Sequence, residues 1–172
     1  GYVNETLPFI STNAVQTARL GTSDAVFARL NSTGSTVLYA SYVGGSETGA
    51  TGPTGEPTVR AGPNGSAYFL TFDNSSNFPT TPGAIQARGR GGRDFILERI
   101  SATGQVDFAT YLGGSGDEFC ETHCLAVDGT GKAYIGGYSL SSDFPTTSQS
   151  FQSVAGSVAV PGDAILAAVS FD

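Results

Sequence analysis

The chain repeats its own sequence with a long period. The segment DAVFARL at residues 24–30 returns as DFILERI at residues 94–100 and as DAILAAV at residues 163–169, at spacings of about 70 residues. The first two copies are each followed by Thr-Gly and then by a Tyr-x-Gly-Gly-Ser segment, at residues 42–46 and 111–115. A period of this length is too long for a helical hairpin and long enough for a four-stranded sheet.

A second block fixes the register of the repeat. NFPTTPGAIQ at residues 77–86 matches DFPTTSQSFQ at residues 143–152, and residues 1–16 match residues 137–152 without a gap. The beginning of the chain therefore corresponds to the end of a repeat.

Short runs of β-favouring residues alternate with Gly, Asn and Asp turn signals inside each repeat. The runs that we expect to form strands, besides those at residues 24–30 and 163–169, are at residues 37–43, 58–61, 67–71, 95–100, 106–112, 125–127 and 133–138. No apolar period of 3.6 residues persists for the length of a helix. The pattern predicts an all-β, antiparallel meander with four strands per repeat, which is the arrangement of a β-propeller blade.

The repeat register also predicts how the chain divides. Residues 24–93 and 94–162 are expected to be two blades, residues 1–23 the end of a preceding blade, and residues 163–172 the first strand of a further one. A propeller ring needs at least about four blades, so this chain is not expected to close by itself. Either it is part of a longer polypeptide, which the absence of Met favours, or identical subunits assemble head to tail through their terminal strands.

The motifs occur in a characteristic order: DAxxARL, Thr-Gly, Tyr-x-Gly-Gly-Ser, AVDGxGxAY and DFPTT. In this order they resemble the bacterial seven-bladed β-propeller repeat, the SBBP family, and the resemblance covers nearly the whole chain. It implies a secreted or cell-surface propeller, and it offers no catalytic residue to carry over. The chain departs from the family pattern in a longer loop at residues 47–57 and in the Cys-containing segment at residues 119–124.

Composition limits the range of partners. With 15 acidic and 8 basic residues the net charge is −7, which argues against nucleic acid and against an anionic membrane surface. No apolar run is long enough to span a membrane, so membrane insertion is not expected. A single Lys among many Ser, Thr and Gly residues is typical of extracellular β proteins. Four Asn-x-Ser/Thr sequons are either chance in such a chain or sites of glycosylation: Asn4, Asn31, Asn64 and Asn74.

Cys120, His123 and Cys124 form the one cluster of soft ligands. They supply three metal ligands, one short of a closed structural zinc site, so we expect no metal or cofactor here. In an extended strand the two cysteines would lie about 13 Å apart, too far for a disulfide. The extra length of residues 119–124 allows a turn instead. We therefore predict a local Cys120–Cys124 disulfide, which suits an oxidising compartment.

Two groups of charged residues are candidate contact sites. Arg88, Arg90 and Arg93 lie in the flexible sequence ARGRGGR and could contact a sulfated or carboxylated glycan or an acidic patch of a partner. The alternative is a solvated connection between blades. Asp117, Glu118 and Glu121 could supply oxygen ligands to Ca²⁺, but they lack the spacing of a known calcium loop.

Catalysis finds little support in the sequence. There is one His, no nucleophile motif, and carboxylates scattered over turns, so no catalytic residue is predicted. The leading interpretation is an extracellular structural or interaction module for surface assembly or adhesion. The alternative is a glycan-binding, lectin-like propeller. A third interpretation is a polysaccharide-active enzyme whose catalytic residues lie outside these repeats.

Overall fold

A computed structural model describes residues 2–46, 57–121 and 123–171 of the chain. These residues form an all-β structure with no α-helix and one 3-10 turn, η1 (Pro63–Gly65). The long loop expected at residues 47–57 lies outside the described residues except for Pro57. The strands are β1 (Tyr2–Val3), β2 (Asp24–Leu30), β3 (Val37–Val43), β4 (Thr58–Ala61), β5 (Ala67–Asp73), β6 (Asp94–Ile100), β7 (Val106–Leu112), β8 (Glu118–Phe119), β9 (Leu125–Val127), β10 (Ala133–Ser139) and β11 (Asp163–Val169).

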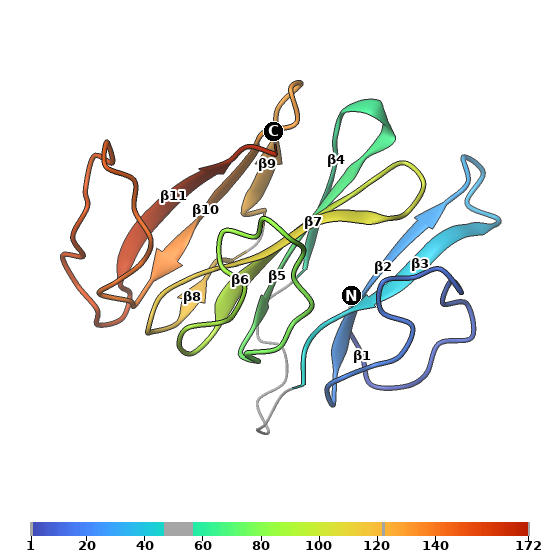
Figure 1. Cartoon of the computed structure of the whole chain (residues 1–172), viewed down its shortest axis with the longest axis horizontal. Helices are drawn as coiled ribbons and strands as arrows, with labels where there is room; N and C mark the ends of the chain where they lie inside the picture. Colours follow the sequence, from blue (N-terminus) through green and yellow to red (C-terminus); the bar gives the residue numbers. More distant parts are fainter. Residues whose placement is uncertain (1, 47–56, 122, 172) are drawn as a thin grey trace.

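The strands form three antiparallel sheets that lie side by side in an open row (Figure 1). The first sheet has the order β1-β2-β3 and the second the order β4-β5-β6-β7. In the third, β10 pairs with β11 on one side and with both β8 and β9 on the other. Four-stranded antiparallel sheets that do not close into a barrel confirm the predicted fold class and are consistent with partial propeller blades.

The repeated aspartates occupy equivalent places in the three sheets. Asp24, Asp94 and Asp163 begin β2, β6 and β11. In every case the aspartate pairs with the last residue of the preceding strand: Val3 opposite Asp24, Asp73 opposite Asp94, and Ser139 opposite Asp163. The sequence repeat is therefore also a repeat of strand register.

The sheets do not begin and end where the sequence repeats do. β5 and β6 are neighbours over their whole length, although the boundary expected at residue 94 falls between them. The second sheet takes β4 and β5 from residues 24–93 and β6 and β7 from residues 94–162. Residues 24–93 and 94–162 therefore do not each form one sheet. β5 and β6 lie next to each other in one sheet, whereas β3 and β4 belong to different sheets (Figure 1).

Two hydrophobic clusters hold the row of sheets together. Alternate side chains of a strand point to opposite faces, and β6 is buried on both. Ile96 and Ile100 belong to the cluster between the first and second sheets, with Phe27. Phe95 and Leu97 belong to the cluster that joins the second sheet to the third. The near-continuous apolar run of β6 is therefore required by its central place in the row.

Long loops cover the outer edges of two sheets. In the loop between β5 and β6, Thr81 N donates to the carbonyl oxygen of Ala109 (3.1 Å), and Tyr111 N donates to that of Gln86 (3.1 Å). These contacts satisfy backbone groups along the free edge of β7, which would otherwise be open to pairing with another chain. The described part of the chain contains no helix long and apolar enough to cross a membrane.

Candidate functional site

A disulfide joins Cys120 and Cys124, as the sequence predicts, with Cα atoms 6.1 Å apart. It links the segments that end β8 and begin β9, and both cysteines pack against the cluster between the second and third sheets. The two sulfur atoms are bonded to each other, so they do not act as metal ligands with His123 in this state. Within the described residues, no group of three His, Cys, Asp or Glu side chains is placed to hold a metal ion.

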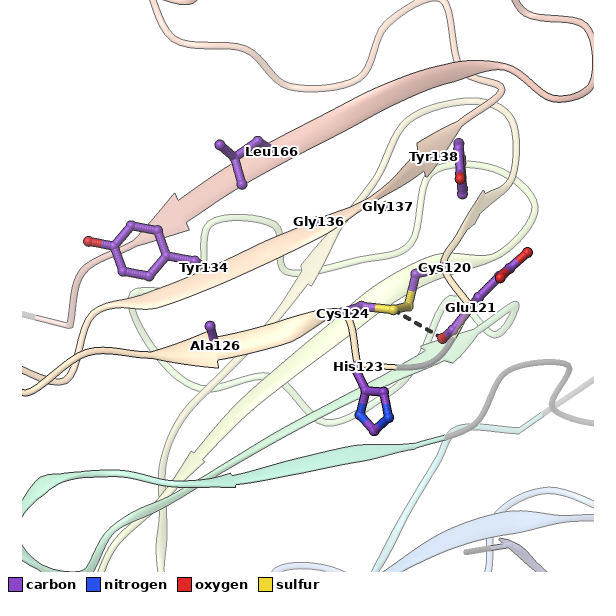
Figure 2. A pocket seen from close by; sticks show the side chains of 10 residues that line it. All are labelled: Cys120, Glu121, His123, Cys124, Ala126, Tyr134, Gly136, Gly137, Tyr138 and Leu166. Atoms are coloured by element: carbon purple, nitrogen blue, oxygen red, sulfur yellow. Dashed lines mark hydrogen bonds between the residues drawn. A yellow bond between two sulfur atoms is a disulfide. The ribbon is translucent and has the colours of Figure 1, made fainter.

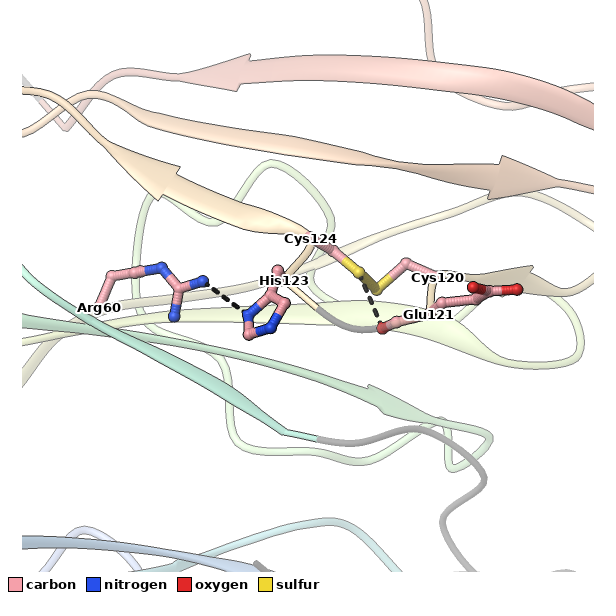
Figure 3. Close-up of a disulfide and its surroundings, with 5 residues drawn as sticks. All are labelled: Arg60, Cys120, Glu121, His123 and Cys124. Carbon is pink, nitrogen blue, oxygen red and sulfur yellow. Dashed lines mark hydrogen bonds between the residues drawn. A yellow bond between two sulfur atoms is a disulfide. The ribbon is translucent and has the colours of Figure 1, made fainter.

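His123 lies at the tip of this disulfide loop in a left-handed backbone conformation, with φ of 68°. Its ring points toward Arg60 of β4, and Nδ1 lies 3.3 Å from the guanidinium NH2 group (Figure 3). Both side chains are outside the buried core, so the contact is a weak one. It nevertheless brings the loop of the third sheet against β4, an edge strand of the second.

A groove of about 470 Å³ runs along the outer face of the third sheet beside the disulfide (Figure 2). Gly136 and Gly137 of β10 form the base of the groove, which therefore has no side chains there. Tyr134, Tyr138 and Leu166 surround it. Leu166 is 80% exposed and Tyr138 is 38% exposed. Aromatic and aliphatic groups on an open face can pack against a second sheet or against the apolar face of a sugar.

The structure separates the three arginines of the candidate contact loop. Arg93 forms an ion pair with Asp117 (3.4 Å), and its guanidinium lies 5.8 Å from the centre of the Phe119 ring. Arg93 is thus tied to the third sheet, whereas Arg88 and Arg90 are exposed. Arg88 and Arg90 are therefore the more accessible to a ligand, while the Arg93 side chain is 30% exposed.

The proposed calcium ligands are also dispersed. Asp117 pairs with Arg93, and Glu118 is fully buried against Ser139 and Ser141. Glu121 lines the groove beside the disulfide instead. The three carboxylates therefore do not converge on one position.

Hydrogen bonds from the Gly-Gly-Ser segments connect each sheet to the next. The amide of Ser46 donates to Oδ1 of Asn77 (2.9 Å), and the amide of Ser115 donates to Oδ1 of Asp143 (2.7 Å). Asn77 and Asp143 occupy matching positions of the repeat, each at the start of a Phe-Pro-Thr-Thr segment. The same contact therefore joins the first sheet to the second and the second to the third.

Buried carboxylates lie beneath the second of these junctions. Burial, together with neighbouring Glu118, raises the pKa of Asp94 to about 7. Oε1 of Glu118 accepts hydrogen bonds from the hydroxyls of Ser139 and Ser141, both at 2.6 Å, and Oε2 accepts one from the amide of Gly114 (2.9 Å). Since the pKa of Asp94 is about 7, this carboxyl group is mainly protonated below neutral pH.

Glu98 is the second buried acid. It stands in the middle of β6, is 3% exposed, and its Oε2 atom has no hydrogen-bond partner. Burial raises its pKa to about 8, so the side chain is mainly protonated at neutral pH.

Three of the four sequon asparagines, Asn4, Asn64 and Asn74, are exposed. Asn31 is half-buried, and its side chain closes the turn between β2 and β3: Nδ2 donates to Ser35 Oγ (3.1 Å), and Oδ1 accepts from the amide of Ser35 (2.9 Å). Nδ2 of Asn31, the atom that a glycan would modify, already takes part in this turn, so the other three asparagines are the more accessible positions.

The sequence interpretation did not identify the buried acids as a group. Asp94 could have been found, because an aspartate recurs at the start of three strands, and so could the glutamines that recur at residues 16, 86 and 152. Glu98 has no counterpart in the other repeats, where Ala28 and Ala167 stand at the matching positions. A charged residue inside an apolar strand was the only signal.

Comparison with protein-family models, with curated proteins and with solved structures found no match to this chain.

Proposed function

We propose that the chain is an extracellular structural or interaction module, a β-propeller segment of the SBBP type that assembles with further sheets. The proposal rests on one position of the repeat, the fourth residue of strands β2, β6 and β11. The fourth residue of β2, Phe27, packs toward the second sheet and is 7% exposed, and that of β6, Leu97, packs toward the third and is 0% exposed. The matching residue of β11, Leu166, is 80% exposed. The third sheet thus presents the face that the other two sheets bury.

The disulfide and the charge support the proposed location. Disulfides persist in oxidising compartments, so Cys120–Cys124 is compatible with an extracellular protein. The order of the repeat motifs favours the SBBP family, whose members are secreted or on the cell surface. The proposal assigns no catalytic residue, cofactor or metal to these repeats.

Self-association of the 172-residue chain tests the assembly role. We expect sedimentation velocity to show concentration-dependent association, because an apolar sheet face is exposed. Leu166→Lys should weaken this association about tenfold or more by placing a charge on the face. Val15→Lys is the matched control, since Val15 is 48% exposed on a loop of the first sheet. A monomer at every concentration, or equal effects of the two substitutions, would contradict the proposal.

The second candidate function is glycan binding, and the groove beside the disulfide favours it. Tyr134 and Tyr138 offer aromatic surfaces there, and Glu121 a carboxylate, while exposed Arg88 and Arg90 could contact an anionic glycan. A glycan array with the intact protein tests this candidate. Selective binding that Tyr138→Ala abolishes would favour the lectin-like role, and an array without selective signals would leave the structural role.

A further inference from the structure

In the second sheet, the tyrosine-bearing strand β7 lies in a defined site, which we call the seat. The seat consists of the edge of β6 and the loop between β5 and β6. The Tyr111 hydroxyl of β7 accepts a hydrogen bond from the amide of Phe78 (2.7 Å) and donates one to the carbonyl oxygen of Ser75 (2.8 Å). Its ring packs edge-on against Phe78, with centroids 5.9 Å apart. The side chain of Gln86 holds Gly113 at both backbone groups, accepting from its amide (2.8 Å) and donating to its carbonyl (2.9 Å).

The first sheet has the same seat with a different strand in it. The Tyr42 hydroxyl of β3 accepts from the amide of Leu7 (2.7 Å), and Tyr42 N donates to the carbonyl of Gln16 (3.2 Å). Oε1 of Gln16 accepts from the amide of Gly44 (3.1 Å). Two independent copies of the seat therefore select the same strand: Ser or Thr, then Tyr, an aliphatic residue, and Gly-Gly-Ser.

The loop that forms the seat is already folded in the third sheet. The amide of Ser150 donates to the carbonyl of Thr147 at 3.0 Å. The matching bonds in the other two loops, Ala84 to Thr81 and Ala14 to Ser11, are 3.1 and 3.0 Å long. The three loops thus share one turn, so this part of the third loop already has the conformation of the strand-bound loops.

In this third copy the seat is open. β11 pairs with β10 along one edge, and no other strand of the described residues lies along its second edge. A pocket opens there between the loop and β11, and its lining includes Phe144, Gln152 and Ile165, the counterparts of Phe78, Gln86 and Ile96. Gln152 is exposed, although Gln86 is not, and Ile165 is half-buried where Ile96 is fully buried.

We propose that the free edge of β11, with the loop of residues 143–156, binds a β-strand of a further repeat that carries Ser/Thr-Tyr-Leu/Val-Gly-Gly-Ser. The strand would pair with β11 through its backbone, place its tyrosine against Phe144, and present its first glycine to the side-chain amide of Gln152. This is strand addition with sequence selectivity from one aromatic pocket. The site is an edge, distinct from the Leu166 face, so the inference goes beyond the proposed function.

A folded second copy of this chain is not the occupant. Its own tyrosine strands, β3 and β7, pair with β2 and β6 along one edge and are covered by loops along the other. Releasing either strand would break the sheet that it belongs to. The occupant is therefore a strand from outside the chain's own three sheets.

A peptide of residues 106–115, VDFATYLGGS, is a direct probe, because it is the strand seated in the second sheet. We flank it with two lysines for solubility and titrate it, to about 1 mM, into the ¹⁵N-labelled 172-residue chain while recording amide shifts. We expect saturable shifts confined to β11 and residues 143–156. A peptide with Tyr111→Ala, which keeps the lysines, should bind about tenfold or more weakly.

Protein variants locate the binding to the seat. Gln152→Ala should weaken peptide binding about three- to tenfold, whereas Gln149→Ala, on the same exposed loop, should leave it unchanged. Leu166→Lys should leave peptide binding intact, so loss of face-to-face assembly and loss of strand binding are separable. The inference would be overturned by a titration without saturation or by equal binding of the Tyr and Ala peptides. Amide shifts outside β11 and residues 143–156 would also overturn it. So would self-association that the peptide displaces, because it would make a second copy the occupant.

Discussion

Gly113 has no room for a side chain beside Asp94. A β-carbon on Gly113 would lie 1.8 Å from Oδ1 of Asp94 and 2.3 Å from Oε2 of Glu118. In the first repeat a β-carbon on Gly44 would lie 2.9 Å from Cγ of Asp24. The first glycine of each Gly-Gly-Ser segment is therefore required by the close approach of the backbone to a buried carboxyl group.

Gly113→Ala should destabilise the fold by about 1–3 kcal/mol, because the new methyl group must displace two buried carboxyl groups that hold the junction. Gly129→Ala is the matched control. Gly129 lies in a turn without a positive φ, and a β-carbon there would have no atom within 4 Å, so its substitution should change stability by less than about 0.5 kcal/mol. Urea unfolding of both variants measures the difference, and equal midpoints would contradict it.

Tyr111→Phe tests the hydrogen bonds of the seated strand. The substitution keeps the ring contact with Phe78 but leaves the buried amide of Phe78 without its acceptor, at a cost of about 1–3 kcal/mol. Tyr134→Phe is the control, since its hydroxyl donates only to Asp128 on the protein surface (3.1 Å). Thermal unfolding should separate the two variants. A Tyr111→Phe protein as stable as the control would show that the hydroxyl does not support the junction.

The buried acids predict that stability falls as the pH rises. The pKa of Asp94 is about 7 and that of Glu98 about 8, both above their ordinary values near 4, so the folded protein binds these protons more tightly than the unfolded chain. Their contribution is complete below pH about 4, and it is lost as the pH increases to about 8. We expect the free energy of unfolding, from urea titrations at pH 5, 6.5 and 8, to decrease by a few kcal/mol over this range.

Glu98→Gln should remove part of this pH dependence. The amide is similar in size and does not ionise, so the variant should be more stable than the wild type at pH 8 and similar to it at pH 5. Glu5→Gln changes the same charge on an exposed residue and should keep the wild-type profile. If Glu98→Gln had the wild-type pH profile, Glu98 would not be the titrating group.

The strands were predictable because local signals agree with the tertiary structure. The run expected at residues 106–112 is β7 with the same bounds, and the run at residues 133–138 is β10 with one residue more. Both are short β-favouring segments bounded by turns, such as the hairpin turn at residues 128–132 between β9 and β10. β1 agrees with the β structure expected at the N-terminal end, where residues 1–16 match residues 137–152. The short strand β8 was not expected, because two residues carry no periodic pattern.

The phase of the repeat was not predictable in the same way. A repeated sequence has no natural starting point, and the blade boundaries expected from the sequence begin at its first recurring motif, at Asp24. Whether β6 pairs with β5 or passes to another sheet depends on the path of the loop at residues 74–93, which packs through long-range contacts such as Gln86 to Gly113. Such contacts leave no local signature. The protonation of Glu98 also leaves no local signature in the sequence, because it depends on burial between two sheets.

Reduction of the Cys120–Cys124 disulfide should have a small and local effect. The bridge closes a very short loop, which restrains few conformations of the unfolded chain, so we expect its loss to destabilise the protein by about 1–2 kcal/mol. The strands of the second sheet should keep their hydrogen exchange protection, because the contacts of β6 with β5 and β7 do not involve the loop. The double substitution Cys120→Ser and Cys124→Ser should reproduce the effect of reduction. Loss of hydrogen exchange protection throughout β5, β6 and β7 would show instead that the disulfide supports the whole row of sheets. Alkylation of both thiols in the unreduced native protein would show that the bridge is absent.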